Sequence, residues 1–225
     1  MKVFKFILAV AIIATMASCG SGSSGKKLAS NDILGDLPNL VYQKSINDSI
    51  LEAEQTAEES KFKDVKKDLS KSEIEKLWAE AMKIDAKFKE REKAADEKFD
   101  AEIEKIKPQL IGKDIPYEVE DGCGYTVSSV KIKDVGNFAN AEFEVSITDE
   151  SAFKTRTWGY VQFCYQLLDK SGNLVDKEYS GEFSSTSISM SQKNGATGKG
   201  TISIFGRSRA PQIVNFAKIK FIKSK

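Results

Sequence analysis

The stretch of residues 46–107 contains neither glycine nor proline and is dominated by lysine, glutamate and alanine. These three residue types are good helix formers, and so long a run without a helix breaker is typical of extended helices. We therefore expect an elongated helical domain over 46–107. No other feature limits the fold as strongly, because a region of this composition has little capacity to form a sheet.

A helix-start signal divides this region in two. Ser70 and Glu73 have the spacing of a capping box, in which each side chain hydrogen-bonds to the backbone N–H of the other residue. We expect a second helix to begin at about Lys71 and to end at Lys107, because Pro108 disfavours its continuation. At 1.5 Å per residue this helix is roughly 55 Å long.

Both helices carry an apolar stripe at helical spacing, and the second also carries charged pairs on its other faces. The stripes need covering, and an antiparallel helical hairpin with coiled-coil-like packing does this within one chain. A homo-oligomeric coiled coil through the helices is the alternative. The stripe of the second helix consists of Ile74, Trp78, Ala81, Phe88, Ala95, Phe99, Ile103 and Ile106.

From Gly112 onward the apolar residues alternate with polar ones, as expected of half-buried strands. About seven short strands, with no helical stretch between them, favour an antiparallel immunoglobulin-like β-sandwich over 112–225. The predicted fold class is thus α+β, a long helical hairpin followed by this sandwich. The strands are centred on Val130–Ile132, Ala141–Ile147, Val161–Leu167, Leu174–Tyr179, Ile188–Met190, Ile202–Ile204 and Ala217–Phe221.

The segment Tyr165-Gln166-Leu167-Leu168-Asp169, followed by Lys170-Ser171-Gly172, resembles the FxLYD-type domain of bacterial surface lipoproteins. In that family an aromatic-x-Leu-x-Asp strand end leads into a polar glycine turn. This chain departs from the pattern with Tyr165 for Phe and Leu168 for Tyr. The resemblance covers about half of the chain and implies an extracytoplasmic β-sandwich without catalytic residues.

The N-terminus has the pattern of an export signal. Lys2 and Lys5 precede a short apolar core at 6–14, so that residues 1–18 are expected to be a signal peptide. The following Met16-Ala17-Ser18-Cys19 resembles the lipobox of bacterial lipoproteins, which implies lipid on Cys19. An ordinary secretory signal is the alternative.

The lipobox also implies a location. We expect a lipid-anchored, extracytoplasmic protein of the bacterial cell envelope, with the outer membrane favoured over the inner. Residues 19–45 would then be a lipidated tether, rich in glycine and serine at 20–25, followed by a segment that docks on another part of the protein.

The chain contains no histidine, which removes Ser-His and Cys-His nucleophile pairs and the commonest general base near neutral pH. We find no metal-ligand spacing and no phosphate-binding loop, and so expect no metal, no cofactor and no enzymatic activity. A net charge of +1 gives no reason to expect nucleic acid as a partner.

A few residues are candidates for specific roles. Cys123 and Cys164 form the candidate disulfide in an oxidising envelope, with two free thiols as the alternative. Trp158, Arg207 and Arg209 lie in expected loops of the sandwich and are candidate binding residues. The predicted function is a structural or protein-interaction lipoprotein that binds an envelope protein. A glycan- or small-ligand-binding surface lipoprotein is the alternative.

Overall fold

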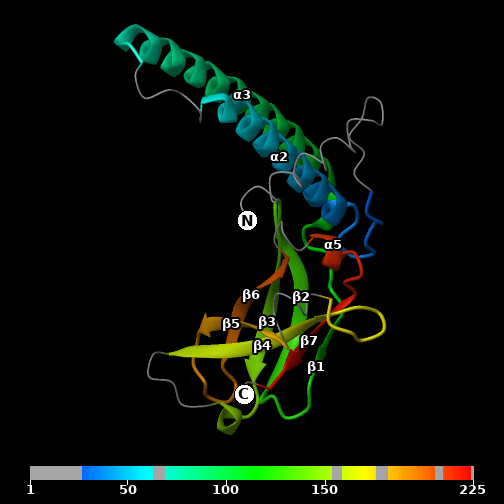
Figure 1. Cartoon of the computed structure of the whole chain (residues 1–225). Helices are drawn as coiled ribbons and strands as arrows, with labels where there is room; N and C mark the ends of the chain where they lie inside the picture. The colour runs from blue at the N-terminus through cyan, green and yellow to red at the C-terminus, as the bar shows by residue number, and fades with distance from the viewer. Residues whose placement is uncertain (1–26, 63–68, 154–158, 176–181, 206–209, 224–225) are drawn as a thin grey trace. The chain divides into compact units, whose positions relative to one another are not determined.

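The computed structural model describes residues 27–62, 69–153, 159–175, 182–205 and 210–223 (Figure 1). The chain divides into two units. The helical unit includes Gln43–Ala101, and the β unit combines Leu28–Tyr42 with Glu102–Lys225. The chain is therefore an α+β protein, as its sequence predicts.

Two long helices, α2 (Leu37–Glu59) and α3 (Lys71–Leu110), differ from their predicted bounds. Helix α2 begins well before residue 46, because Pro38 occupies its first turn, where the missing N–H is not needed. Helix α3 continues through Pro108, and the Ile111 N–H donates to the carbonyl of Lys107 at 3.0 Å. The prediction that α3 ends at Lys107 is therefore wrong, since helical hydrogen bonding resumes after the proline.

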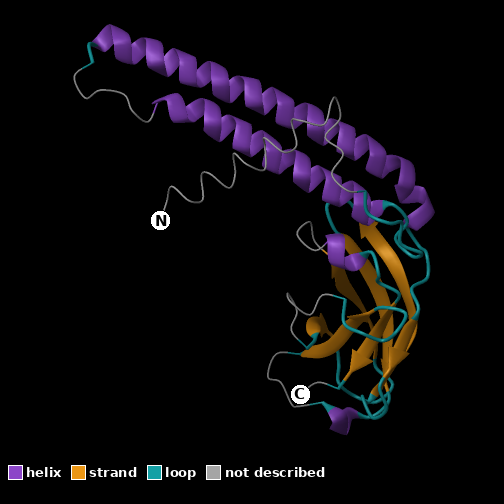
Figure 2. Cartoon of the chain, turned by 45° about the vertical axis from the view of Figure 1, so that its right-hand side comes forward, coloured by secondary structure: helices purple, strands orange, loops and turns teal. Residues whose placement is uncertain are grey.

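Within the helical unit, α2 and α3 lie side by side (Figures 1 and 2). Leu51 of α2 packs with Ile84 and Phe88 of α3, and Phe62 and Ala95 flank these buried side chains. Ion pairs along the contact join later positions of α2 to earlier positions of α3, so that the two helices run in opposite directions: Lys87–Glu58, Arg91–Glu54 and Lys44–Asp96.

The β unit contains two sheets, mostly antiparallel. One has the order β2-β3-β6 and the other β1-β7-β4-β5, with β1 and β7 parallel. Short helical segments, η2 (Glu150–Ala152) and α5 (Ala210–Ile213), lie between strands. The strands are β1 (Tyr117–Val119), β2 (Tyr125–Val135), β3 (Ala139–Ile147), β4 (Tyr160–Leu168), β5 (Ser184–Ser189), β6 (Thr197–Phe205) and β7 (Lys218–Ile222).

The strands of the β unit are shown in Figure 2. Aromatic rings from its two sheets pack against each other, which makes the arrangement sandwich-like. Phe143 of β3 lies 5.6 Å from Phe163 of β4 and 5.1 Å from Phe221 of β7, measured between ring centroids. Tyr125 of β2 contacts Phe163 edge-on at 4.9 Å. Alternating burial along β3 places every second side chain in this core, as the period of two predicts.

Six of the predicted strands coincide with strands of the structure. The seventh, over 174–179, lies partly outside the described residues, and Leu174 makes a single bridge to Leu168. Strand β1 was not predicted, because only three residues form it and its partner β7 is about a hundred residues away along the chain. Three residues are too few to show an alternation of apolar and polar side chains, so such a strand is recognised only from its pairing with another strand.

Candidate functional site

Four of the six residues singled out from the sequence lie outside the described part of the structure. These are the lipidation candidate Cys19 and the loop candidates Trp158, Arg207 and Arg209. Their roles stay predictions. Cys123 and Cys164 can be located, and three further features lie on the described residues.

The two located cysteines are both buried free thiols. The buried hydroxyl of Tyr125, a residue of β2, has no hydrogen-bond partner of ordinary geometry among the described residues. Burial raises the pKa of the Cys123 thiol, and burial together with the neighbouring thiols raises the pKa of Tyr125. The raised pKa keeps the Cys123 thiol protonated near neutral pH, so Cys123 is poorly suited to act as a nucleophile.

The first surface feature is on α3, where Ile74, Trp78 and Met82 form what we call the apolar strip. These side chains are 43%, 68% and 68% exposed, respectively, and they are spaced four residues apart on one helix face. Beside the strip lies an apolar hollow of about 290 Å³, lined by Phe62, Leu69, Ile74, Leu77, Trp78 and Ala81.

The exposure of Ile74 and Trp78 corrects the prediction that they belong to a covered stripe. Helix α2 covers the side of α3 that carries Ile84 and Phe88, and Trp78 lies about a quarter of a turn away from that side. One apolar stripe on α3 is thus two adjacent surfaces, one packed on α2 and one open. The signal that separates them is Met82, which falls outside the predicted stripe but follows Trp78 by four residues.

The start of α3 is fixed beside the strip by the predicted capping box, which is confirmed. The Ser70 N–H donates to a Glu73 carboxylate oxygen at 2.8 Å, and the Glu73 N–H donates to the Ser70 hydroxyl at 3.4 Å. Hydrogen bonds from the hydroxyl and N–H of Ser70 lower the pKa of Glu73. Helix α3 therefore presents Ile74 and Trp78 from a capped, well-defined first turn.

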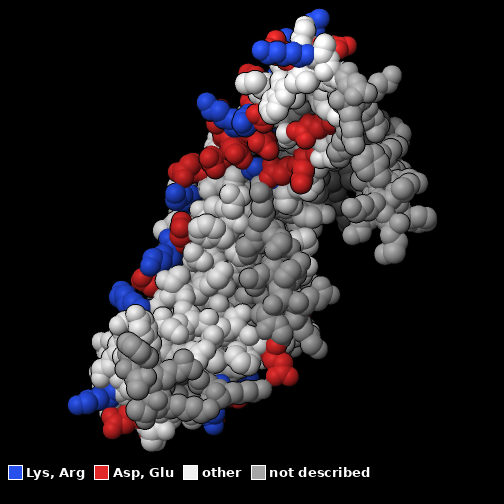
Figure 3. Space-filling view, turned by 60° about the vertical axis from the view of Figure 1, so that its left-hand side comes forward, with Lys and Arg blue, Asp and Glu red and all other residues white. Residues whose placement is uncertain are grey.

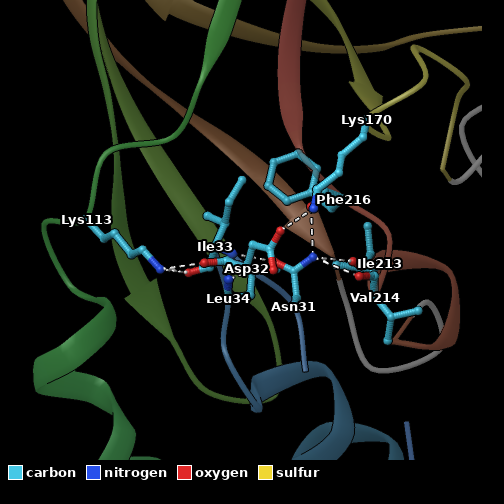
Figure 4. Close-up of polar contacts among 9 residues, drawn as sticks. All are labelled: Asn31, Asp32, Ile33, Leu34, Lys113, Lys170, Ile213, Val214 and Phe216. Carbon is cyan, nitrogen blue, oxygen red and sulfur yellow. Dashed lines mark hydrogen bonds and ion pairs between the residues drawn. The ribbon is translucent and has the colours of Figure 1, made fainter. Parts of the chain in front are cut away.

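The second feature, in the β unit, is a clasp formed by Asn31 (Figure 4). Its side-chain amide donates to the carbonyls of Val214 at 2.9 Å and Phe216 at 2.8 Å, and at 3.4 Å to Ile213. Its side-chain oxygen accepts from the N–H groups of Ile33 and Leu34. Asn31 is 5% exposed, and its hydrogen-bonding capacity is fully used, so its role is to hold the segment 28–42 on the β unit.

The third feature is a polar hollow of about 350 Å³ beside this clasp, on the β unit. Lys170 forms an ion pair with Asp32 at 2.6 Å, and hydrogen bonding to Lys170 lowers the pKa of Asp32. The pKa of Asp169 is also lowered, first by the backbone N–H of Asn173. Both carboxyl groups are therefore ionised near neutral pH and already engaged, so neither is suited to act as a general acid. The other lining residues are Ala29, Ser30, Asn31, Ser171, Val214, Asn215 and Phe216.

Basic and acidic side chains share the face shown in Figure 3, in keeping with the net charge of +1. Within the described residues, no three acidic or cysteine side chains come together as metal ligands would. None of the described helices combines the length and the apolar character that a membrane span requires. Comparisons with protein-family models, with curated proteins and with solved structures gave no match.

Proposed function

We propose that this chain is a lipid-anchored protein of the bacterial envelope that acts as a non-catalytic protein-interaction module. The apolar strip is the observation that carries the proposal, because large, contiguous exposed apolar side chains on a soluble surface commonly mark a protein contact. The strip is also continuous with the apolar hollow, which gives a partner side chain a concave place to pack.

The two units support this role in different ways. We infer that α2 and α3 form a helical hairpin that presents the strip, and that the β unit is an immunoglobulin-like sandwich. Strand β3 pairs with β6 in one sheet, and the strands that follow them in the chain, β4 and β7, pair with each other in the other sheet. Chain connections between two sheets in this order are typical of Greek-key sandwiches. Lipid on Cys19 would attach the chain to the membrane, with the outer membrane favoured over the inner, and the segment 20–25 would act as a flexible tether.

The interaction role is tested by photo-crosslinking in intact envelopes. A photoreactive residue in place of Trp78 should give protein adducts, whereas the same residue in place of Glu80 should not, because Glu80 lies on the opposite face of α3. Adducts at both positions, or lipid adducts alone at Trp78, would contradict a specific protein contact.

The anchoring role is tested separately, by fractionation. Cys19→Ser should move the chain from the membrane fraction to the soluble fraction while leaving the β unit folded. A membrane fraction that is unchanged by Cys19→Ser would overturn the lipid anchor without touching the interaction role.

A second candidate function, the binding of a glycan or another small polar ligand, is favoured by the polar hollow. The hydroxyls of Ser30 and Ser171 and the side-chain amide of Asn215 line this hollow and could hydrogen-bond to a sugar. The candidate binding residue Trp158 lies outside the described residues and does not contribute to this argument. Isothermal titration with envelope polysaccharides, compared between the natural chain and Lys170→Ala, distinguishes this function from the first.

A further inference from the structure

We infer that the apolar strip of α3 binds the same strip of a second copy of this chain, with the two α3 helices antiparallel and related by a two-fold axis at Trp78. The inference rests on the proposed function, in which the strip is a protein contact surface. It adds the identity of the partner.

The strip is symmetric about Trp78 in its apolar residues. Ile74 and Met82 lie four residues before and after Trp78, and all three are exposed. In an antiparallel pair of helices related by a two-fold axis, residues equally spaced from the axis face each other. Ile74 of each copy would then lie opposite Met82 of the other, and the two Trp78 rings would meet at the centre.

The flanking charges are antisymmetric about the same point, as such a pair requires. Lys71 lies seven residues before Trp78 and Asp85 seven residues after it, on the same helix face. Both side chains reach solvent, since Lys71 is exposed and the Asp85 side chain is 49% exposed. An antiparallel pair places each Lys71 opposite the partner's Asp85, which forms two ion pairs. A parallel pair would instead place like charges opposite each other.

The described residues leave both flanking charges able to form a further ion pair. Asp85 pairs with Lys89 at 2.8 Å on the surface, and this contact leaves room for a second cation at the carboxylate. Lys71 stands at the first residue of α3, where the helix dipole disfavours a positive charge. A partner carboxylate at that position offsets this unfavourable placement.

Helix α2 leaves the strip open for such a partner. In the part of α3 nearest the strip, the side chains that pack on α2 are Ile84 and Phe88, which lie between a quarter and a third of a turn away from Trp78. A second α3 can therefore dock without displacing α2. The core of the helical unit and the new contact would be neighbours through the apolar hollow.

The contact is small and we expect it to be weak. One tryptophan buries about 150–250 Å², so that three residues from each copy stay below the roughly 1,200 Å² of a stable interface. The dimer should therefore form at tens of micromolar or above, a concentration that confinement of the chain to a membrane would favour.

Oligomeric mass and charge reversal form the first test, carried out on the full chain in a Cys19→Ser background. Sedimentation should show a concentration-dependent dimer that Trp78→Asp abolishes. The matched control is Ala94→Asp, which places the same charge on an exposed position on the far side of α3. Lys71→Asp and Asp85→Lys should each weaken the dimer by about tenfold, and the two changes together in one chain should restore it.

Loss of the fold cannot account for the Lys71→Asp result, because an acidic residue at a helix start stabilises the helix. A weaker dimer in that variant therefore reports the contact itself. If charge reversal leaves the dimer unchanged, or if the combined variant is no better than the single ones, the pairing of Lys71 with Asp85 is wrong.

Cysteine crosslinking in the same background tests the geometry. Trp78→Cys should crosslink to itself, and Lys71→Cys should crosslink only to Asp85→Cys in a mixture of the two chains. Two Lys71 positions in the antiparallel pair would be about 21 Å apart along the helix axis, too far for a disulfide. Self-crosslinking of Lys71→Cys would show a parallel pair and overturn the proposal.

Other occupants give distinguishable results. A monomer at all concentrations, with photo-adducts at Trp78 to a different envelope protein, overturns self-association and leaves the proposed function in place. A monomer whose Trp78 binds vesicles of phosphatidylglycerol, with no protein adduct, overturns both in favour of a membrane surface.

Discussion

At the scale of single residues, the side chain of Asn31 joins segments that lie far apart in the sequence. It connects the start of the described chain to carbonyls more than 180 residues later, and all of these contacts are buried or nearly so. Removing such a buried polar group lowers the free energy of unfolding by more than the net value of its hydrogen bonds, because its former partners stay buried from water without a hydrogen bond.

We therefore expect Asn31→Asp to destabilise the β unit more than Asn31→Ala does. The alanine leaves carbonyls and N–H groups unsatisfied, at a cost of about 2–4 kcal/mol, whereas the aspartate adds a negative charge facing three carbonyl oxygens. Urea unfolding measures both, with Asn137→Asp on the surface as the control. Equal effects of Asn31→Asp and Asn137→Asp would show that the clasp does not stabilise the fold.

Asp169 gives a pH-dependent prediction. The N–H groups of Asn173 and Ser171 donate to its carboxylate at 2.8 Å, and these bonds lower its pKa. A pKa that is lower in the folded state adds stability above the unfolded pKa of about 3.9, and that stability is lost as the pH falls through the folded value. An NMR titration should place the Asp169 midpoint lower in the folded chain than in urea. Identical midpoints would show that the turn does not bind the carboxylate in solution.

At the scale of elements, the sequence predicts features that depend on neighbouring residues, but it does not predict which distant segments pack together. The alternation of apolar and polar residues along β3 and β4 and the capping box of α3 each involve residues close together in the sequence. The sequence alone is therefore enough to predict them. Strand β1 and the Asn31 clasp depend on residues a hundred or more positions away. The open face at Trp78 was missed for a related reason, because periodicity identifies an apolar face but not the width that α2 covers.

The capping box of α3 is expected to contribute about 1 kcal/mol to the first turn of the helix. Ser70→Ala combined with Glu73→Ala should therefore speed hydrogen exchange of the amides in that turn, while amides near Phe99 keep their protection. Exchange that is unaltered between Leu69 and Ile74 would mean that packing, rather than capping, fixes the start of α3.

The close packing around Gly200 of β6 allows a prediction about the core between the two sheets. A Cβ atom at this position would lie 2.4 Å from Phe143 Cε1 and 2.6 Å from Ile188 Cδ1. Gly200→Ala should thus lower the free energy of unfolding by about 1–3 kcal/mol, since a packed core resists an added methyl group. Gly136→Ala is the matched control, because nothing lies within 4 Å of its added atom. Equal stabilities of the two variants would show that β6 can shift to accept the methyl group.

At the scale of the whole molecule, the two units differ in the size of their apolar cores. Among its described residues, the helical unit buries only a few large apolar side chains, namely Leu51, Ile84, Phe88 and Phe99, whereas the β unit buries aromatic rings from both sheets. The α+β class follows from composition and period, which differ sharply on the two sides of residue 110. The assignment of 28–42 to the β unit could not be foreseen, since that segment is too mixed in character to show what it packs against.

The unequal cores predict two unfolding steps. With increasing urea, hydrogen exchange followed by mass spectrometry should show that peptides from 43–62 and 69–101 lose protection before peptides from β3, β4 and β6. The reason is that the helical unit has fewer buried contacts to lose. A single transition shared by all peptides would instead indicate that the two units unfold as one cooperative body.

The Asn31 clasp also has a mechanical consequence. Tension applied to the chain ahead of Leu28 reaches Asn31 before it reaches α2, and the hydrogen bonds to Val214 and Phe216 transfer that load directly to the C-terminal part of the β unit. The ion pair of Lys170 with Asp32 and the hydrogen bonds of Lys113 to the carbonyls of Asp32 and Ile33 share the load. A pull on the N-terminal end would therefore strain the β unit first and leave the contacts between α2 and α3 relaxed until the clasp ruptures.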